Sequence, residues 1–167
     1  MLLVFLDFNL NIGRSTIGLI PDFIGYIIVD KGLAELADES YRFAKARGFA
    51  KGMAVYTGIL YFMDLLGITN DNSAGAFILG LVSTLISLYI SYSVVKGIED
   101  MEVSRGKGLN AVSLNSAWKM NACFSLAAYL LILIPFLSVI CMLVSLVAAI
   151  VFLVALNKSK KLYYGTV

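Results

Sequence analysis

The chain has no histidine, only two cysteines, and few charged residues, which make up 14% of its 167 positions. Without histidine it lacks the commonest general base and the commonest metal ligand. The net charge of +2 is too small to indicate a nucleic-acid partner. These absences argue against the usual enzymes and metal centres, and we predict no metal, no cofactor and no catalytic residue.

The two cysteines, Cys123 and Cys141, both lie inside apolar runs. If Pro135 marks the turn of a helical hairpin, the two thiols differ in depth by about 9 Å along the helices. That separation is beyond the reach of a disulfide. We therefore predict two free thiols that pack as small buried hydrophobic residues.

The abundant component is apolar: 60% of the residues are hydrophobic, and the mean hydropathy is +0.88. Soluble chains are roughly 45–50% apolar and about 25% charged. A soluble fold of this length could not bury so much apolar surface. The composition predicts an all-α integral membrane protein, folded as a single membrane domain over residues 1–167.

Long uncharged segments give the predicted spans. Residues 74–95 carry no Asp, Glu, Lys or Arg, and neither do residues 120–156. As one helix the second segment would measure about 55 Å, against a hydrocarbon core of roughly 30 Å, so it must fold back at Pro135. The firm predicted spans are 52–68, 74–95, 118–136 and 138–156. The first of these belongs to a longer helix, from about residue 40 to 67, capped by Ser40 or Asp38.

Residues 1–37 allow two interpretations. Apolar residues recur at helical spacing after Pro21, but Asp22, Asp30 and Lys31 interrupt them. Either residues 17–37 are a fifth span with inward-facing charges, or residues 21–37 are an amphipathic helix on the cytoplasmic surface. Residues 1–12 are too short for a span and are predicted to be interfacial or re-entrant. The expected fold is a bundle of four to five transmembrane helices.

Basic residues predict the orientation, because cytoplasmic loops carry an excess of Lys and Arg. Eleven of the 13 basic residues fall in three segments, 42–51, 96–119 and 158–161. They are Arg42, Lys45, Arg47, Lys51, Lys96, Arg105, Lys107, Lys119, Lys158, Lys160 and Lys161. We predict that these segments and the C-terminus are cytoplasmic, with Trp118 beside Lys119 at the membrane boundary.

Small polar residues recur every four positions on the predicted helices. Ser83, Ser87 and Ser91 form one such row, and Asn121 and Ser125 form another. Small residues let helices approach closely, and hydroxyls hydrogen-bond between them. The rows therefore indicate either close packing or a hydrated path, and the sequence leaves both open.

Asp64 is the only acid within a firm span. Acids inside membranes are costly and often functional. Arg14 is the basic residue expected on the same side, so we predict an ion pair between Asp64 and Arg14. Asp7, Asp22 and Asp30 are each explained by a helix cap or a solvated face, and they give no metal site.

Two N-terminal segments carry a resemblance. Residues 5–10 read FLDFNL and residues 19–26 read LIPDFIGY. This pattern resembles uncharacterised small multi-pass membrane proteins of low-GC Gram-positive bacteria. The resemblance covers part of the first third of the chain, implies a bacterial plasma-membrane location, and carries no catalytic residue with it.

Two functions remain open at this point. The first is a non-enzymatic accessory module, whose small-residue faces bind another membrane protein or a second copy of the chain. The second is a small transporter or channel-like protein with a path lined by Ser and Asn. In both, the lipid bilayer is the surrounding partner. A water-accessible cavity that reaches Ser87 or Asn121 would favour the second.

Overall fold

The computed structural model describes residues 9–12, 15–18, 22–66, 73–131 and 134–165. These residues form five helices and one short antiparallel hairpin, in which Asn9 pairs with Gly18 and Ile12 with Ser15. The elements are β1 Asn9–Ile12, β2 Ser15–Gly18, α2 Asp22–Glu35, α3 Tyr41–Leu65, α4 Ser73–Arg105, α5 Ala111–Leu130 and α6 Pro135–Tyr164. The predicted helical class is therefore confirmed for this part of the chain.

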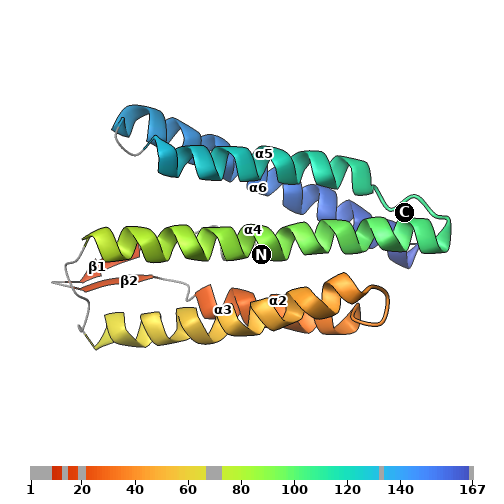
Figure 1. Cartoon of the computed structure of the whole chain (residues 1–167), viewed down its shortest axis with the longest axis horizontal. Helices are drawn as coiled ribbons and strands as arrows, with labels where there is room; N and C mark the ends of the chain where they lie inside the picture. Colours follow the sequence, from red (N-terminus) through yellow and green to blue (C-terminus); the bar gives the residue numbers. More distant parts are fainter. Residues whose placement is uncertain (1–8, 13–14, 19–21, 67–72, 132–133, 166–167) are drawn as a thin grey trace.

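The five helices form two antiparallel pairs on either side of one central helix. Helices α2 and α3 pack together on one side of α4, and α5 and α6 pack together on the other (Figure 1). Helix α4 contacts α3 in the first pair and α5 in the second. The two pairs are thus joined mainly through α4.

Local chemistry sets several helix ends. The Ser40 hydroxyl accepts a hydrogen bond from the Arg42 backbone amide at 3.2 Å, which confirms the predicted cap before α3. Gly106 follows α4 with a φ of 59°, a left-handed conformation that glycine adopts without strain. Helix α6 begins at Pro135, which confirms that the long apolar segment breaks there.

The helices differ from the predicted spans in extent. Helix α4 continues ten residues beyond the predicted end at 95, because its last turns carry charged residues that hydropathy does not detect. Helix α5 runs from Ala111 to Leu130, so the predicted 118–136 span is displaced toward the C-terminus. The reason is that Pro135 occupies the first turn of α6, where its missing N–H is harmless, rather than the centre of the turn.

The N-terminal region differs most from expectation. The span expected over 17–37 is wrong, because residues 15–18 form strand β2. Helix α2 covers 14 residues from Asp22, close to the alternative helix over 21–37. A helix of that length is about 21 Å long, short of a roughly 30 Å core. Phe23, in the first turn of α2, packs over Gly58 of α3. Helix α3 continues beyond this contact to Leu65. The hairpin lies beside the remaining part of α3, which β2 contacts (Figure 1).

The loops 36–40 and 106–110 and the end of α6 lie at one end of the bundle, called here the basic end (Figure 1). The half of the molecule nearest this end, the packed half, holds most of the buried apolar core. Phe43 is fully buried against Gly97, where an added Cβ would lie 2.5 Å from the Phe43 ring. The remaining core members include Leu33, Ala46, Ala50, Ile90, Val95, Ile98, Met101, Leu114 and Phe152.

An aromatic layer lies where the packed half ends. The Phe49 and Tyr89 rings are 4.8 Å apart, and the Tyr92 and Trp118 rings are 4.9 Å apart. The Trp118 indole N–H donates to the Leu88 carbonyl at 3.2 Å. Beyond this layer lies the cavity half, which contains the other parts of all five helices.

The outer surface of the bundle is rich in exposed apolar side chains, such as Val55, Phe62, Leu66, Ile78 and Phe136. A monomeric soluble protein rarely exposes such a surface. Among the described residues, two helical stretches are long and apolar enough to cross a membrane, Phe77–Arg105 and Phe136–Tyr164. These two stretches support membrane association.

The cysteines are both free, as predicted, but only Cys141 is buried. The expectation that Cys123 is also buried is wrong, because its side chain lies on an exposed face of α5.

Candidate functional site

All five helices contribute to a cavity of about 560 Å³ in the cavity half. This volume falls within the range of small-molecule sites, about 300–1,000 Å³. The described residues that line it are Asp22, Tyr26, Met53, Thr57, Leu60, Gly80, Ser83, Thr84, Ser87, Leu88, Ser125, Ala128, Tyr129, Ser138, Met142, Ser145 and Leu146.

The lining is notable for hydroxyl groups. Nine of the 17 lining residues are Ser, Thr or Tyr, and Asp22 is the only ionisable acid or base other than tyrosine among them. Helical spacing explains the arrangement, since residues three, four or seven apart share one helix face. Ser83 and Ser87 follow this spacing on α4, as do Ser138 and Ser145 on α6.

Hydrogen bonds cross the cavity between helices. The Tyr26 hydroxyl of α2 bonds the Ser87 hydroxyl of α4. The Thr84 hydroxyl of α4 and the Tyr129 hydroxyl of α5 are 3.0 Å apart. These two bonds connect α4 to both helix pairs.

A third group of polar residues joins α5 to α6. The hydroxyl oxygens of Ser125 and Ser145 are 2.7 Å apart, and Ser145 donates to the Asn121 side-chain oxygen at 3.2 Å. A chain of three polar side chains thus holds α5 against α6, and two of them, Ser125 and Ser145, line the cavity.

The structure separates the predicted polar rows into two groups. Ser83, Ser87 and Ser125 line the cavity. Ser91 and Asn121 are each only 2% exposed and do not line it. Ser91 donates to the Ser87 and Leu88 carbonyls of its own helix, as a packing residue does.

The predicted pair of Asp64 and Arg14 lies outside the described side chains. Residue 64 belongs to α3, but its side chain is not described, and residue 14 falls in the gap between β1 and β2. The pair stays a prediction. Of the three N-terminal acids, Asp7 lies outside the described residues, Asp30 accepts a hydrogen bond from Arg47 at 2.8 Å, and Asp22 lines the cavity.

Several cavity residues were not predicted as site residues. Tyr26 and Tyr129 have the appearance of ordinary membrane aromatics in the sequence, and Ser138 stands at the start of a predicted span. The available signal was a polar atom inside an apolar helix, at Thr57 and Ser138 in particular. Their convergence depends on how the two helix pairs meet α4, which local spacing does not encode.

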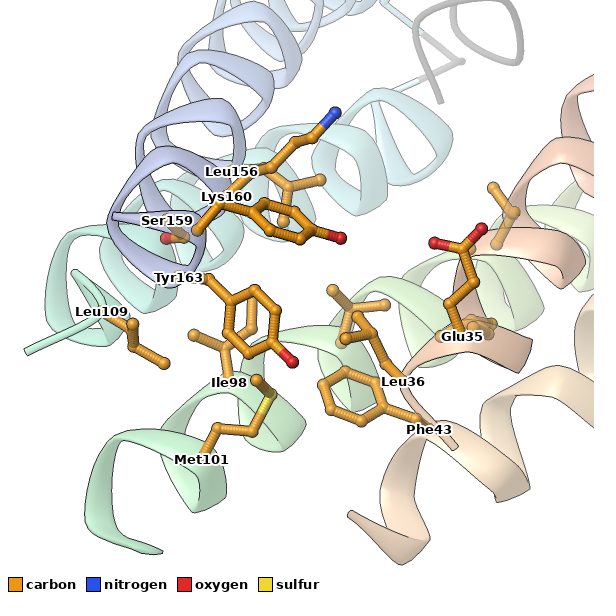
Figure 2. Close-up of a pocket in the computed structure, with 15 residues that line it drawn as sticks. Glu35, Leu36, Phe43, Ile98, Met101, Leu109, Leu156, Ser159, Lys160 and Tyr163 are labelled. Atoms are coloured by element: carbon orange, nitrogen blue, oxygen red, sulfur yellow. The ribbon is translucent and has the colours of Figure 1, made fainter. Parts of the chain in front are cut away.

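A second hollow, the end pocket, lies in the packed half and has a volume of about 350 Å³ (Figure 2). Its wall is almost entirely apolar and includes Leu36, Phe43, Ile98, Met101 and Leu156, with Glu35 on the α2 side and Lys160 on the α6 side. It offers few groups that could orient a polar ligand. The cavity is therefore the better candidate site.

Charged residues connect the segments at the basic end. Arg105 at the end of α4 bonds Glu39 of the 36–40 loop, and Tyr163 of α6 donates to Glu39 at 3.3 Å. The hydrogen bond with Glu39 raises the pKa of Arg105. The Arg105 guanidinium also lies 4.7 Å from the centre of the Tyr163 ring.

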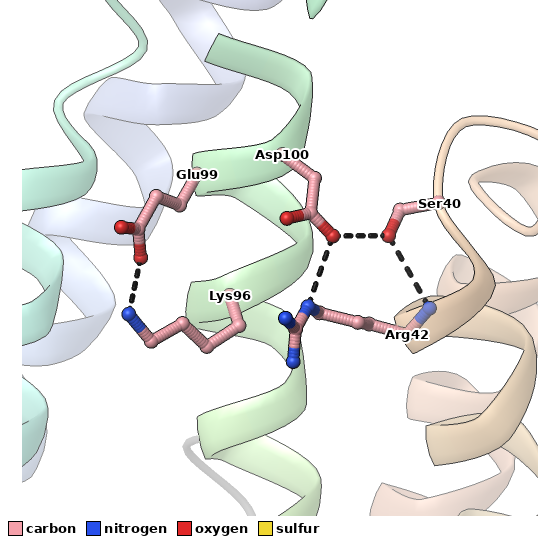
Figure 3. A network of polar contacts seen from close by, with 5 residues as sticks. All are labelled: Ser40, Arg42, Lys96, Glu99 and Asp100. Carbon is pink, nitrogen blue, oxygen red and sulfur yellow. Dashed lines mark hydrogen bonds and ion pairs between the residues drawn. The ribbon is translucent and has the colours of Figure 1, made fainter. Parts of the chain in front are cut away.

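A second set of polar contacts joins α3 to α4 (Figure 3). The Asp100 carboxylate accepts hydrogen bonds from the Ser40 hydroxyl at 2.7 Å and the Arg42 Nε at 3.0 Å. Lys96 and Glu99 pair one turn away, at 2.6 Å, and this hydrogen bond raises the pKa of Lys96. Both sets lie beyond residue 95 of α4, on the basic-end side of the aromatic layer.

Comparison of the chain with protein-family models, with curated proteins and with solved structures found no match. The function must therefore be argued from the site.

Proposed function

We propose that the chain is a small membrane transporter or channel-like protein that holds a small polar solute in the hydroxyl-lined cavity. The observation that carries the proposal is the cavity itself: nine hydroxyl-bearing residues from five helices face one hollow of about 560 Å³. In a membrane, polar side chains that face a shared interior commonly mark a solute path.

In this proposal α3, α4, α5 and α6 cross the membrane, and α2 crosses only part of it. The exposed apolar surfaces of the cavity half face lipid. The basic end faces the cytoplasm by the positive-inside rule, together with the C-terminus. The three predicted basic segments lie at that one end of the bundle, as this orientation requires (Figure 1). The N-terminal resemblance supports a bacterial plasma membrane.

The accessory-module function has less support. It requires small-residue faces that are free to bind a partner. Ser125 instead bonds Ser145 within the α5/α6 pair, and Ser87 bonds Tyr26 across the cavity. These small polar faces are occupied by contacts within the chain. The proposed function includes no chemical step.

Solute flux into proteoliposomes tests the proposal. The full chain is reconstituted, and stopped-flow light scattering measures entry of urea and glycerol against empty liposomes. We expect the protein to raise the rate, and a double substitution of Ser83→Leu with Ser87→Leu to abolish the increase by filling the cavity.

Ser116→Leu is the matched control, because Ser116 is exposed on α5 and does not line the cavity. Size-exclusion elution of each variant in detergent shows whether it folds. The proposal is supported if Ser116→Leu keeps the full flux while the double variant folds but gives no increase in flux. Equal flux from the chain and from empty liposomes would contradict it.

A further inference from the structure

The hydrogen bonds that the cavity hydroxyls make within the protein restrict the kind of solute that the cavity can bind. A hydroxyl has one proton to donate and two lone pairs that accept. Where the proton already bonds a protein acceptor, only lone pairs remain for a ligand. The direction of each hydrogen bond in the lining therefore decides whether that hydroxyl offers a ligand a donor or only an acceptor.

Four lining hydroxyls donate to backbone carbonyls. Ser83 donates to Leu79 at 2.9 Å and Thr84 donates to Gly80 at 2.9 Å. On the neighbouring helices, Thr57 donates to Met53 at 2.7 Å and Ser138 donates to Ala128 at 3.0 Å. A helix carbonyl is an acceptor only, so these four directions are fixed.

Three further lining hydroxyls also have their protons engaged in hydrogen bonds within the protein. Since Thr84 gives its proton to a carbonyl, Tyr129 must be the donor in the bond between them. Since Ser145 gives its proton to the Asn121 oxygen, Ser125 must donate to Ser145. Tyr129, Ser125 and Ser145 therefore have no proton left for a ligand.

The Tyr26 and Ser87 pair shares one hydrogen bond, so only one of their two protons can point into the cavity. Seven of the nine hydroxyls thus present lone pairs alone. Asp22 also lines the cavity, and no Lys or Arg is among the described lining residues. The described wall is rich in acceptors and nearly empty of donors.

We infer that the cavity selects small solutes that donate several hydrogen bonds, namely neutral N–H or O–H compounds and primary ammonium ions, and that it rejects anions. A donor solute satisfies the exposed lone pairs. An anion would face those lone pairs without a donor to bind it, and burying an anion that lacks a hydrogen-bond donor is costly. This inference rests on the proposed solute-binding function and names its substrate class.

Protection of an introduced cysteine tests the selection directly. Ser83→Cys is made in a chain whose Cys123 and Cys141 are replaced by alanine, and the protein is reconstituted in liposomes. The rate of reaction with a small water-soluble thiol reagent is measured with each solute present. Occupancy is thereby measured separately from flux.

The probes form matched pairs that differ in their donors. Urea is compared with tetramethylurea, and methylammonium with tetramethylammonium, which keeps the charge but has no N–H. Acetate is the anion. We expect urea and methylammonium to slow labelling at least threefold, and the methylated compounds and acetate to leave the rate unchanged.

Equal protection by the methylated compounds, or protection by acetate, would overturn the inference even if flux is observed. Absence of protection by every probe would also overturn it. Protection by donors without flux keeps the inference and instead rejects transport.

Discussion

The two halves of the bundle are built from the same helices but in different ways. In the packed half, Phe43 fits against Gly97, and charged side chains join the loops outside the core. In the cavity half the helices separate around hydroxyl groups, and apolar side chains point outward. The contrast shows that one helix can support a tightly packed interface along part of its length and a polar hollow along the rest.

This division suggests a division of roles. The packed half fixes the two helix pairs against α4 near the basic end. The cavity half, with fewer buried apolar contacts, holds the candidate site. Substitutions in the two halves should therefore differ in what they change: stability in the first, solute occupancy in the second.

The largest expected effect is on stability in the packed half. Phe43→Ala removes a fully buried ring and should lower the free energy of unfolding by about 3–5 kcal/mol. Phe62→Ala, on the same helix but 58% exposed, is the control and should change it by less than about 1 kcal/mol. Denaturant unfolding in micelles measures both, and equal losses would remove the distinction between the halves.

A smaller effect is expected between α5 and α6, beside the cavity. Asn121→Ala deprives Ser145 of its acceptor and should cost about 0.6 kcal/mol, the average for hydrogen bonds between membrane helices, and at most about 1.7 kcal/mol. Asn157→Ala, at an exposed position of α6, provides the comparison. If both variants unfold at the same denaturant concentration, the polar chain between α5 and α6 does not hold that pair.

The sequence predicted the parts of this fold that depend on local chemistry. The Ser40 cap and the break at Pro135 follow from the preferences of single residues. The extension of α4 past residue 95 was missed because hydropathy detects the lipid-solvated length of a helix and not its charged continuation. The span over 17–37 was wrong because strands β1 and β2 give only a weak alternating pattern, whereas the alternative helix over 21–37 is close to α2.

For the candidate site, periodicity identified Ser83, Ser87 and Ser125, because residues on one helix face repeat every three or four positions. It also included Ser91 and Asn121, which share that spacing but are buried by a neighbouring helix. Tyr26, Thr57 and Ser138 come from other helices. Their place at the cavity depends on tertiary packing, which a single sequence does not specify.

Filling the end pocket should stabilise the packed half slightly. An added Cβ at Gly32 meets nothing within 4 Å, so Gly32→Leu can extend into the pocket that Gly32 lines. Gly48→Leu, equally unobstructed but outside the pocket, shows the gain from helix propensity alone, about 0.5–1 kcal/mol. Thermal unfolding should rank Gly32→Leu above Gly48→Leu, and the reverse order would show that the pocket is not filled.

The smallest effect is expected at the exposed charges of the packed half. Asp100→Asn removes the charge that Arg42 pairs with, and both side chains are almost half exposed. The loss should be about 0.2–1 kcal/mol and should shrink as salt is added. A loss that is unchanged at high salt would indicate a structural role of the Asp100 carboxylate other than charge pairing.

The most direct test of the proposed solute-binding cavity is whether water reaches it in a lipid bilayer. In the chain lacking both native cysteines, Ser83→Cys and Val82→Cys are compared, because Ser83 lines the cavity and Val82 is exposed on the outer, apolar surface of the same helix. A small water-soluble thiol reagent should label residue 83 at least ten times faster than residue 82. Equal, slow labelling at both positions would show a dry bundle and contradict a solute-binding cavity.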